Sequence, residues 1–398
     1  MAVASSQKVL TSIASFEILQ NNHRFVTRLS SNGNLTDGIL NGDLVVQGSG
    51  DPSLGSWRWT GTKPAKVMQL MTDAVAKAGI KQVLGSIRID SSNFSTQSIP
   101  DGWIWQDIGN YYGAGIGKLN WKENQYDLQL RSGSTTGGEV KILNGIDSVT
   151  GRDNFLNELR SAAKGSGDNA IIYLPVGDAK SPVSGTIPIG ESRFVISGAI
   201  PHPETVFLYD LEKALLAKGI TVDHLLPQTV GELFSREICA YTSPSLDSLN
   251  FWFLRRSINL YGEAFVKAIS LNKTRFSSTN GGVEEVRNFW AANGIEKSAI
   301  NIIDGSGLSP QNRVTTQSLV SAMRYAVERP WFNSFYEALP VINSLKMKSG
   351  SIGGARSFTG YTRKQNKISY IFAIVVNNYD GGSAAVVQKL YSILDNLK

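Results

Sequence analysis

A serine and a lysine near the start of the chain have the spacing of a nucleophile and its base. Ser5-Ser-Gln-Lys8 opens a stretch, residues 5–20, whose apolar side chains recur at helical intervals. Positions i and i+3 share one face of a helix, so the Ser5 hydroxyl and the Lys8 amine can meet. A lysine accepts a proton only in its neutral form, which burial and a second nearby cation favour. The motif therefore predicts a serine hydrolase that uses lysine as its base, with Ser5 near the positive end of a helix dipole.

A histidine-dependent triad or a metal site has much less support. The chain has three histidines, His23, His202 and His224, and no Gly-x-Ser-x-Gly elbow for a nucleophile to occupy. There is no His-Glu-x-x-His or Cys-x-x-Cys pair, so the sequence implies no metal and no cofactor. The single cysteine, Cys239, lies in an apolar context and is expected to be structural.

Two further motifs strengthen the first one. Ser-x-x-Lys is a weak signal alone, because it recurs at Ser161 and Ser270, and the Ser-x-Asn pattern of Ser257-Ile-Asn259 also recurs elsewhere. Lys348-Ser-Gly350, followed by Ser351, occurs once and stands just before the strand-like end of the chain. The order of the motifs counts most: the first opens an apolar helix, the second lies among helices, and the third precedes the last strands.

This ordered set resembles the active site of penicillin-binding proteins and serine β-lactamases. It is most similar to the class C low-molecular-mass penicillin-binding proteins, the D-alanyl-D-alanine carboxypeptidase/endopeptidase family. Three longer stretches carry the likeness: Leu40 to Pro52 (LNGDLVVQGSGDP), Ser257 to Glu263 (SINLYGE) and Asp304 to Ser309 (DGSGLS). The resemblance covers essentially the whole chain, and the long stretch between the first two motifs matches two domains that this family inserts there.

The resemblance implies acyl transfer to water through an ester on Ser5. Lys8 would deprotonate Ser5, and Ser257 with Lys348 would relay a proton to the leaving D-Ala amine. Asn259 would hold the substrate amide. No cofactor is implied for this reaction.

Other residues are implied to bind the substrate. Lys348, Ser349 and Gly350 would bind its terminal carboxylate, and the backbone N–H groups of Ser5 and Ser351 would form the oxyanion hole. Asp107, in an aromatic and glycine-rich loop, has two interpretations. It either caps a turn, or it faces the Ser5 cleft and pairs with the ammonium at the far end of a stem peptide.

The sequence departs from the family pattern in three places. Ser349 stands where threonine is commoner, which keeps the hydroxyl. Pro310 stands where relatives often have an arginine linked to the diaminopimelate end of the substrate, and Arg313 lies nearby. The family normally has a segment before the Ser-x-x-Lys helix that contributes to the catalytic sheet, whereas this chain reaches the motif at once. We therefore expect an uncovered sheet edge beside the C-terminal strand.

The overall composition limits the partners. The 398 residues carry a formal net charge of +6, with lysine and arginine scattered along the chain. Nucleic-acid binding therefore has little support, whereas a basic surface suits an anionic polymer such as the cell wall. No run approaches 18 apolar residues, so no transmembrane segment is expected. The resemblance implies peptidoglycan stem peptides and β-lactam antibiotics as partners and a periplasmic or cell-envelope location, with a signal peptide removed or truncated, and it allows a homodimer.

The patterns of hydrophobicity predict an α/β (α+β) multidomain fold. Strand-like segments occupy 25–60 and 83–90, a β-rich stretch covers 118–186, and the last strand spans 368–377. Helices are expected at 64–79, 206–218, within 245–295, at 314–328 and at 383–397. The resemblance implies how these elements are divided: a penicillin-binding/β-lactamase-like transpeptidase domain (1–24 and 229–398), split by an inserted domain (25–117 and 187–228) that itself contains a β-rich domain (118–186).

Two alternatives share these motifs. A β-lactamase would use the same nucleophile but hydrolyse its acyl-enzyme quickly, and the long insertion argues against it. An inactive relative would bind peptidoglycan without forming a covalent adduct with penicillin. Both remain open on the sequence alone.

Overall fold

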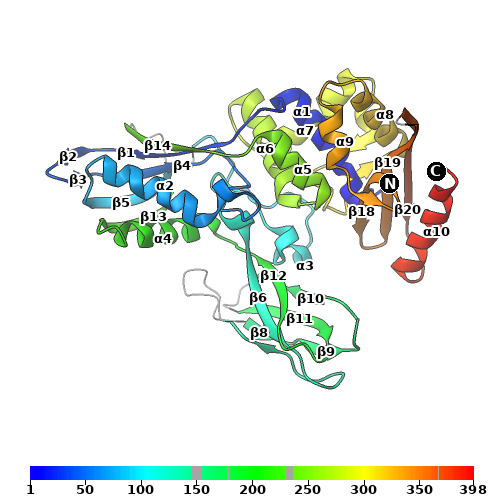
Figure 1. Ribbon diagram of the computed structural model, residues 1–398, viewed down its shortest axis with the longest axis horizontal. Helices are drawn as coiled ribbons and strands as arrows, with labels where there is room; N and C mark the ends of the chain where they lie inside the picture. The colour runs from blue at the N-terminus through cyan, green and yellow to red at the C-terminus, as the bar shows by residue number, and fades with distance from the viewer. Residues whose placement is uncertain (91, 145–154, 177–179, 230–235, 366) are drawn as a thin grey trace. The chain divides into compact units, whose positions relative to one another are not determined.

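The computed structural model of the chain describes residues 1–90, 92–144, 155–176, 180–229, 236–365 and 367–398. It separates into two compact units. The first contains Met1–Arg24, Asn93–Trp103 and Pro244–Lys398, and the second contains Phe25–Ser92 and Ile104–Ser243. Both combine helices with sheets, which confirms the expected mixed α/β class (Figure 1). The boundaries expected for three nested domains stay a prediction.

The first unit is built on an antiparallel sheet with the strand order β17-β18-β19-β20. Its strands are β17 (Val341–Ile342), β18 (Leu345–Ile352), β19 (Ala355–Lys364) and β20 (Lys367–Asn377). Helices α8 (Thr316–Val327) and α10 (Ser383–Asp395) lie on opposite sides of this sheet (Figure 1). Leu390 and Leu394 of α10 pack against Met347, Phe358 and Phe372, so apolar burial attaches α10 to the sheet.

Helix α1 (Lys8–Leu19) lies at the centre of the helical part of this unit. It continues directly from the 3-10 turn η1 (Ala4–Gln7) and packs against α5, α6, α7 and α8. Val9, Leu10 and Ile13 are fully buried, as expected for a helix surrounded by other helices. The remaining elements of the unit are α5 (Leu246–Arg255), α6 (Asn259–Thr274), α7 (Thr279–Ala292), η5 (Lys297–Ala299), β15 (Ile300–Asn301), β16 (Arg313–Val314) and α9 (Phe332–Ala338).

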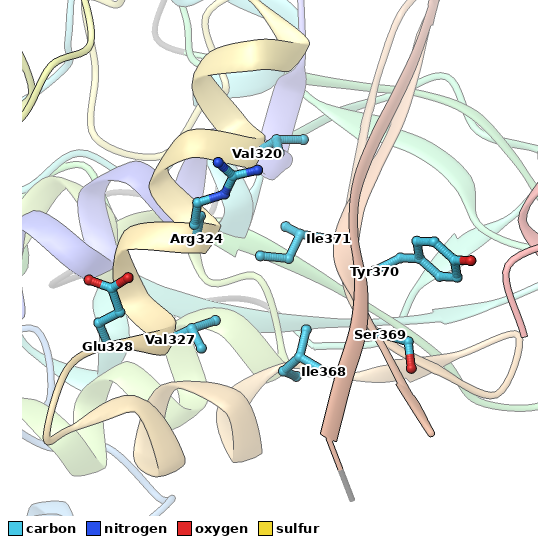
Figure 2. A pocket seen from close by; sticks show the side chains of 8 residues that line it. All are labelled: Val320, Arg324, Val327, Glu328, Ile368, Ser369, Tyr370 and Ile371. Atoms are coloured by element: carbon cyan, nitrogen blue, oxygen red, sulfur yellow. The ribbon is translucent and has the colours of Figure 1, made fainter. Parts of the chain in front are cut away.

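A pocket of about 460 Å³ lies between α8 and β20 (Figure 2). Ile368 and Ile371 of β20 point toward the helix although they are three residues apart in sequence. Strand alternation alone would not place them on one face. The register between β19 and β20 shifts there, and the extra residue, Ser369, restores the alignment. None of the residues lining this pocket belongs to the three motifs.

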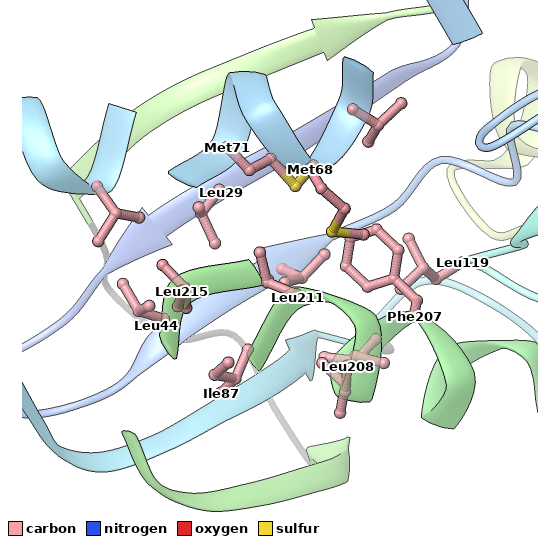
Figure 3. Packing of buried hydrophobic residues seen from close by; sticks show 14 of the residues in the cluster. Leu29, Leu44, Met68, Met71, Ile87, Leu119, Phe207, Leu208, Leu211 and Leu215 are labelled. Carbon is pink, nitrogen blue, oxygen red and sulfur yellow. The ribbon is translucent and has the colours of Figure 1, made fainter. Parts of the chain in front are cut away.

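The second unit is centred on a mixed sheet with the order β14-β1-β4-β5-β3-β2, in which β13 also pairs with β5. Its strands are β1 (Val26–Ser31), β2 (Asn34–Thr36), β3 (Ile39–Asn41), β4 (Leu44–Gln47), β5 (Gln82–Asp90), β13 (Thr221–Thr229) and β14 (Arg236–Thr242). Helices α2 (Pro64–Lys77) and α4 (Pro203–Leu216) both begin with proline, whose fixed φ suits the first helical position. Met68, Met71, Phe207 and Leu211 from these helices meet Ile87 of the sheet in one apolar core (Figure 3).

A smaller β-rich part of the second unit has an apolar cluster of its own, which includes Leu128, Val183 and Ile196. One sheet has the order β12-β6-β7, and another joins β8, β9 and β10 to β11. The strands are β6 (Gln125–Arg131), β7 (Lys141–Ile142), β8 (Phe155–Asn157), β9 (Arg160–Ala162), β10 (Asn169–Ile172), β11 (Ser181–Pro188) and β12 (Phe194–Ala199). Short helical turns are η2 (Thr60–Thr62), α3 (Trp105–Ile108), η3 (Tyr111–Gly113) and η4 (Lys122–Asn124). Throughout the described ranges, no helix combines the length and apolarity needed to cross a membrane.

Candidate active site

Ser5 lies in η1 and Lys8 is the first residue of α1, so the two side chains come from one continuous stretch of helical backbone. Lys8 Nζ lies 2.9 Å from Ser5 Oγ, within hydrogen-bonding distance. Lys8 is fully buried, whereas Ser5 is only half-buried. The hydroxyl therefore keeps some access to solvent while the amine is shielded from it.

Three oxygen atoms surround the Lys8 amine. Besides Ser5 Oγ, Nζ donates to Asn259 Oδ1 at 2.6 Å and to the carbonyl of Ser306 at 2.7 Å. A neutral amine has two N–H donors and one lone pair. If the two donors serve Asn259 and Ser306, the lone pair is left to accept the proton of Ser5. This is the arrangement that a general base requires.

Two buried lysines shape the electrostatics of the site. Burial lowers the pKa of Lys8 to about 7, against the charges of Asp304 and Glu263, which raise it. Lys348, on β18, is 1% exposed and donates to the carbonyl of Ser349 at 2.7 Å. Burial, and then the positive charge of Lys8, hold the pKa of Lys348 well below its usual range. Near neutral pH, part of the Lys8 population is therefore neutral.

Hydrogen bonds attach η1 to strands β18 and β19. Ser357 Oγ donates to the carbonyl of Val3 at 2.6 Å and lies 2.8 Å from Ser6 Oγ, which in turn lies 3.3 Å from the carbonyl of Lys348. A Cβ at Gly350 would lie 2.2 Å from the Val3 carbonyl and 2.4 Å from Ser357 Oγ, so only glycine allows this close approach. The glycine of the third motif thus positions the turn that carries the nucleophile.

The Ser-x-Asn motif lies at the start of α6. Asn259 is buried and its side chain contacts Lys8, whereas Ser257 is half-buried. Within the described residues, the Ser257 hydroxyl is hydrogen-bonded to neither Ser5 nor Lys348. Ser257 has φ 57, and Ala4, next to the nucleophile, has φ 46. Such left-handed conformations of non-glycine residues cost on the order of 1 kcal/mol and often cluster at active sites.

The loop after β15 folds around a buried carboxylate. Asp304 accepts hydrogen bonds from the N–H groups of Gly307 and Ser309, both at 2.7 Å, and from Asn312 Nδ2 at 2.9 Å. Trp103 Nε1, which belongs to the same unit, donates to Asp304 at 2.9 Å. These contacts fix the loop that presents the Ser306 carbonyl to Lys8. In the sequence, this loop is marked only by the DGSGLS stretch.

Glu263 is a second buried carboxylate without a role predicted from the sequence. It accepts from the N–H groups of Gly305 and Ser306 at 3.0 and 2.9 Å. Its sequence signal is the four-residue spacing from Asn259, which places both side chains on one face of a helix.

The other residues predicted for substrate binding lie in two places. Ser349 and Ser351 follow Lys348 on β18, where Ser349 is half-buried and Ser351 is exposed. Asp107 belongs to α3 of the second unit, is half-buried, and accepts a hydrogen bond from the Tyr112 hydroxyl at 3.3 Å. Burial raises the pKa of the Asp107 carboxyl. Its expected role toward substrate stays a prediction.

The two other Ser-x-x-Lys matches have structural surroundings. Ser161 Oγ accepts from the N–H of Gly133 at 2.9 Å, and Ser270 Oγ donates to the carbonyl of Phe276 at 2.7 Å. Ser161 lies on a strand, where it and Lys164 do not have helical spacing. Among the residues described, no group of three or more His, Cys, Asp or Glu side chains could hold a metal ion.

Comparison with known proteins places the whole chain in one group. Residues 1–396 match the D-Ala-D-Ala carboxypeptidase 3 (S13) family. The chain is 24% identical over 418 residues to the D-alanyl-D-alanine carboxypeptidase of Actinomadura sp. (strain R39), covering 98% of this chain and 76% of that protein. It is also 24% identical over 410 residues to the D-alanyl-D-alanine carboxypeptidase DacB of Haemophilus influenzae, covering 96% of this chain and 81% of that protein.

Solved structures show the same fold. The crystal structure of penicillin binding protein 4 (dacB) from Haemophilus influenzae superposes with a TM-score of 0.84 at 22% identity, covering 100% of this chain and 91% of that one. A second structure of that protein, complexed with a β-lactam, gives a TM-score of 0.78 at 20% identity, covering 100% and 90%.

Proposed function

The chain belongs to the D-Ala-D-Ala carboxypeptidase 3 (S13) family, and from that premise we propose that it is a serine D-alanyl-D-alanine carboxypeptidase with endopeptidase activity toward peptidoglycan stem peptides. The observation that carries the proposal is the buried amine of Lys8, hydrogen-bonded to the half-buried hydroxyl of Ser5. A serine beside a lysine of lowered pKa is suited to nucleophilic attack without histidine.

The reaction follows from these groups. Neutral Lys8 takes the proton of Ser5 as Oγ attacks the carbonyl carbon between the last two D-alanines. The C–N bond to the terminal D-Ala breaks, and its amine receives a proton relayed by Ser257 and Lys348. Water then attacks the Ser5 ester and releases the shortened stem peptide. In the endopeptidase reaction the leaving amine belongs to a cross-linked stem peptide instead.

We assign substrate binding to β18 and its neighbours. The ammonium of Lys348 and the hydroxyl of Ser349 would bind the terminal carboxylate beside Gly350, and Asn259 would hold the substrate amide. The backbone N–H groups of Ser5 and Ser351 would stabilise the oxyanion. The burial of Lys348 supports this assignment, because an entering carboxylate would supply the opposite charge that stabilises its protonated form and raises its lowered pKa.

The biological setting follows from the substrate. Peptidoglycan lies outside the cytoplasmic membrane, so we propose a periplasmic or cell-envelope location. β-Lactams resemble the D-Ala-D-Ala end and are expected to acylate the same serine, in line with the β-lactam complex of the Haemophilus influenzae relative. Self-association into a homodimer stays a prediction, which sedimentation velocity would check.

The test is mass spectrometry of the protein after incubation with benzylpenicillin. We expect one covalent adduct, which peptide mapping places on Ser5 and which Ser5→Ala abolishes. Mapping to Ser161 or Ser270 would overturn the assignment of the nucleophile, and absence of any adduct would favour an inactive peptidoglycan-binding relative. Rapid turnover of a chromogenic cephalosporin would instead indicate a β-lactamase.

A further inference from the structure

Glu263 is a fully buried carboxylate that holds the backbone next to Lys8. Its Oε2 accepts from the N–H of Gly305 at 3.0 Å, and its Oε1 accepts from the N–H of Ser306 at 2.9 Å. The carbonyl of Ser306 accepts in turn from Lys8 Nζ at 2.7 Å. Ser306 therefore links the two ionisable groups, with its N–H facing the carboxylate and its C=O facing the amine.

Helix α6 serves the Lys8 amine in two ways. Asn259, at the start of the helix, accepts from Lys8 directly, and Glu263, one turn later on the same face, acts through Ser306. The loop packs closely on the helix, because a Cβ at Gly305 would lie 2.3 Å from the carbonyl of Gly262. Two of the three oxygen neighbours of Nζ thus depend on α6.

Charged groups from every element around this point contribute to the balance. They are Lys8 from α1, Glu263 and Lys267 from α6, Asp304 from the loop after β15, and Lys348 from β18. Burial, and then the charge of Asp304, raise the pKa of Glu263 to about 8, whereas its two N–H donors and Lys8 lower it. Burial lowers the pKa of Lys267 to about 8 against the charge of Glu263, and Lys267 Nζ donates to the carbonyl of Gln97 at 2.7 Å.

We propose that Glu263 is a positioning residue for acyl transfer: it fixes the Ser306 carbonyl as a partner of Lys8 Nζ, and its charge controls how readily Lys8 loses its proton. The inference rests on the proposed role of Lys8 as the base. An anion stabilises a nearby ammonium, so ionised Glu263 raises the pKa of Lys8. A purely structural carboxylate would hold the loop but leave this titration unchanged.

The decisive variant is Glu263→Gln, which keeps the shape of the side chain and removes its charge. Because the pKa of Glu263 is raised to about 8, only part of its population is ionised while Lys8 titrates near 7. We therefore expect the pKa of Lys8 to fall by less than about one unit, as the ammonium loses this partial anion. The measurement is an NMR titration of protein labelled with ¹³Cε-lysine, in which the Lys8 signal is identified by its loss in Lys8→Met. An unchanged or higher pKa of Lys8 in Glu263→Gln overturns the proposal.

Acylation by benzylpenicillin supplies a second readout. In Glu263→Gln, the acid limb of the rate–pH profile should move to lower pH together with the Lys8 titration. The plateau should fall roughly tenfold, because the amide cannot accept from both N–H groups. Glu284→Gln is the matched control, since it removes an exposed carboxylate of the same unit and should leave the Lys8 pKa and the acid limb in place. If the plateau of the acylation rate falls in Glu263→Gln while the acid limb of its pH profile stays in place, Glu263 has a structural role only.

Reciprocity keeps the proposal testable if Glu263→Gln does not fold. If Glu263 raises the pKa of Lys8 by a given amount, Lys8 lowers the pKa of Glu263 by the same amount. Lys8→Met should therefore raise the pKa of Glu263, measured with ¹³Cδ-glutamate labelling. An unchanged Glu263 titration overturns the coupling. Neither titration needs acylation, so a wild-type protein that shows the coupling but forms no penicillin adduct refutes the proposed function and not the coupling.

Discussion

The two units bury charge in different ways. In the second unit, the core between the main sheet, α2 and α4 consists of apolar side chains (Figure 3). The buried carboxylate of Glu123, elsewhere in the same unit, forms an ion pair with Arg58 at 2.8 Å. In the first unit, three lysines, Lys8, Lys267 and Lys348, are at most 1% exposed, and every buried lysine among the described residues belongs to this unit.

The comparison distinguishes apolar side chains, whose burial stabilises the fold, from the lysines of the first unit, whose burial serves the chemistry of the site. Removing an apolar side chain from water stabilises the fold, whereas removing an ammonium costs free energy unless its charge is balanced. The first unit tolerates that cost at the place where a neutral lysine can accept a proton from serine. A variant that removes the buried charge of Lys8 should therefore affect activity and stability in opposite directions, which no variant of the apolar core should do.

The largest effect is expected for Lys8→Met. Acylation by benzylpenicillin should slow by roughly 10²–10⁴-fold, because the base is lost. The free energy of unfolding should rise at pH 6, because burial disfavours the ammonium that the variant removes. The gain is reduced because Asn259 Oδ1 and the Ser306 carbonyl lose their donor. Stopped-flow acylation and urea denaturation measure the two quantities.

The stability gain of Lys8→Met should depend on pH. The pKa of Lys8 is lowered from its usual value to about 7 in the folded protein, so the unfolded chain binds more protons above that pH. Wild-type stability therefore increases as pH rises from about 7 toward the usual lysine pKa, and the advantage of the variant shrinks over the same range. Lys389→Met, on the exposed side of α10, is the control. A variant less stable than wild type at pH 6 would contradict the comparison.

The apolar core should respond to Phe207→Ala in the conventional way. Phe207 is fully buried and packs edge-to-face on Trp121 at 5.1 Å. We expect a loss of about 3–5 kcal/mol in the free energy of unfolding, with a smaller loss for Phe207→Leu, because less volume is removed. Urea denaturation followed by tryptophan fluorescence measures both variants. A loss below about 1 kcal/mol would show that this core is not tightly packed.

Gly350→Ala tests the join between the nucleophile turn and the sheet. The added methyl would collide with the Val3 carbonyl and Ser357 Oγ, so we expect a destabilisation of about 2–3 kcal/mol. Acylation should slow roughly tenfold, because Ser5 moves with η1. Gly353→Ala is the matched control, since a Cβ there meets nothing within 4 Å. Equal acylation rates for both variants would show that η1 tolerates displacement.

The smallest effect is expected for Asp107→Asn, outside the first unit. If Asp107 pairs with the free amine of a stem peptide, kcat/KM should fall roughly tenfold for a substrate with that amine and stay unchanged for its acetylated form. Synthetic peptides that differ only at the amine provide the comparison. An equal effect on both substrates would leave Asp107 with the turn-capping role alone.

Periodicity predicted the elements that bury apolar side chains. The helix expected at 64–79 is α2 (Pro64–Lys77), and the strand expected at 368–377 is β20 (Lys367–Asn377). In both, the spacing of hydrophobic residues reports directly on the buried face. The helix expected from residue 5 begins instead as a 3-10 turn, because η1 forms contacts with β18 and β19 that no local pattern encodes.

The polar residues that hold the site in place are harder to predict from the sequence. Motif spacing identified Ser5 and Lys8, but in the sequence a single buried Glu263 or Ser357 cannot be distinguished from a polar surface residue. Their partners are far away in the chain: Ser357 contacts Val3 across 354 positions. Hydrogen bonds of this range depend on the completed fold, so neither periodicity nor propensity can predict them.

The hydrogen bond between Ser357 and Val3 also has a consequence for the timing of folding. A ribosome adds about 5–20 residues per second, so Val3 is synthesised roughly 18–70 s before the residue that holds it. During that time α1 has no strand β18 or β19 to pack against, and Ser5 and Lys8 lack the surroundings that activate them. Residues of η1 and α1 therefore reach their final positions only after β18 and β19 have been synthesised. A chain interrupted before β19 would carry the nucleophile but no working site, so synthesis itself delays the carboxypeptidase activity until β19 has been made.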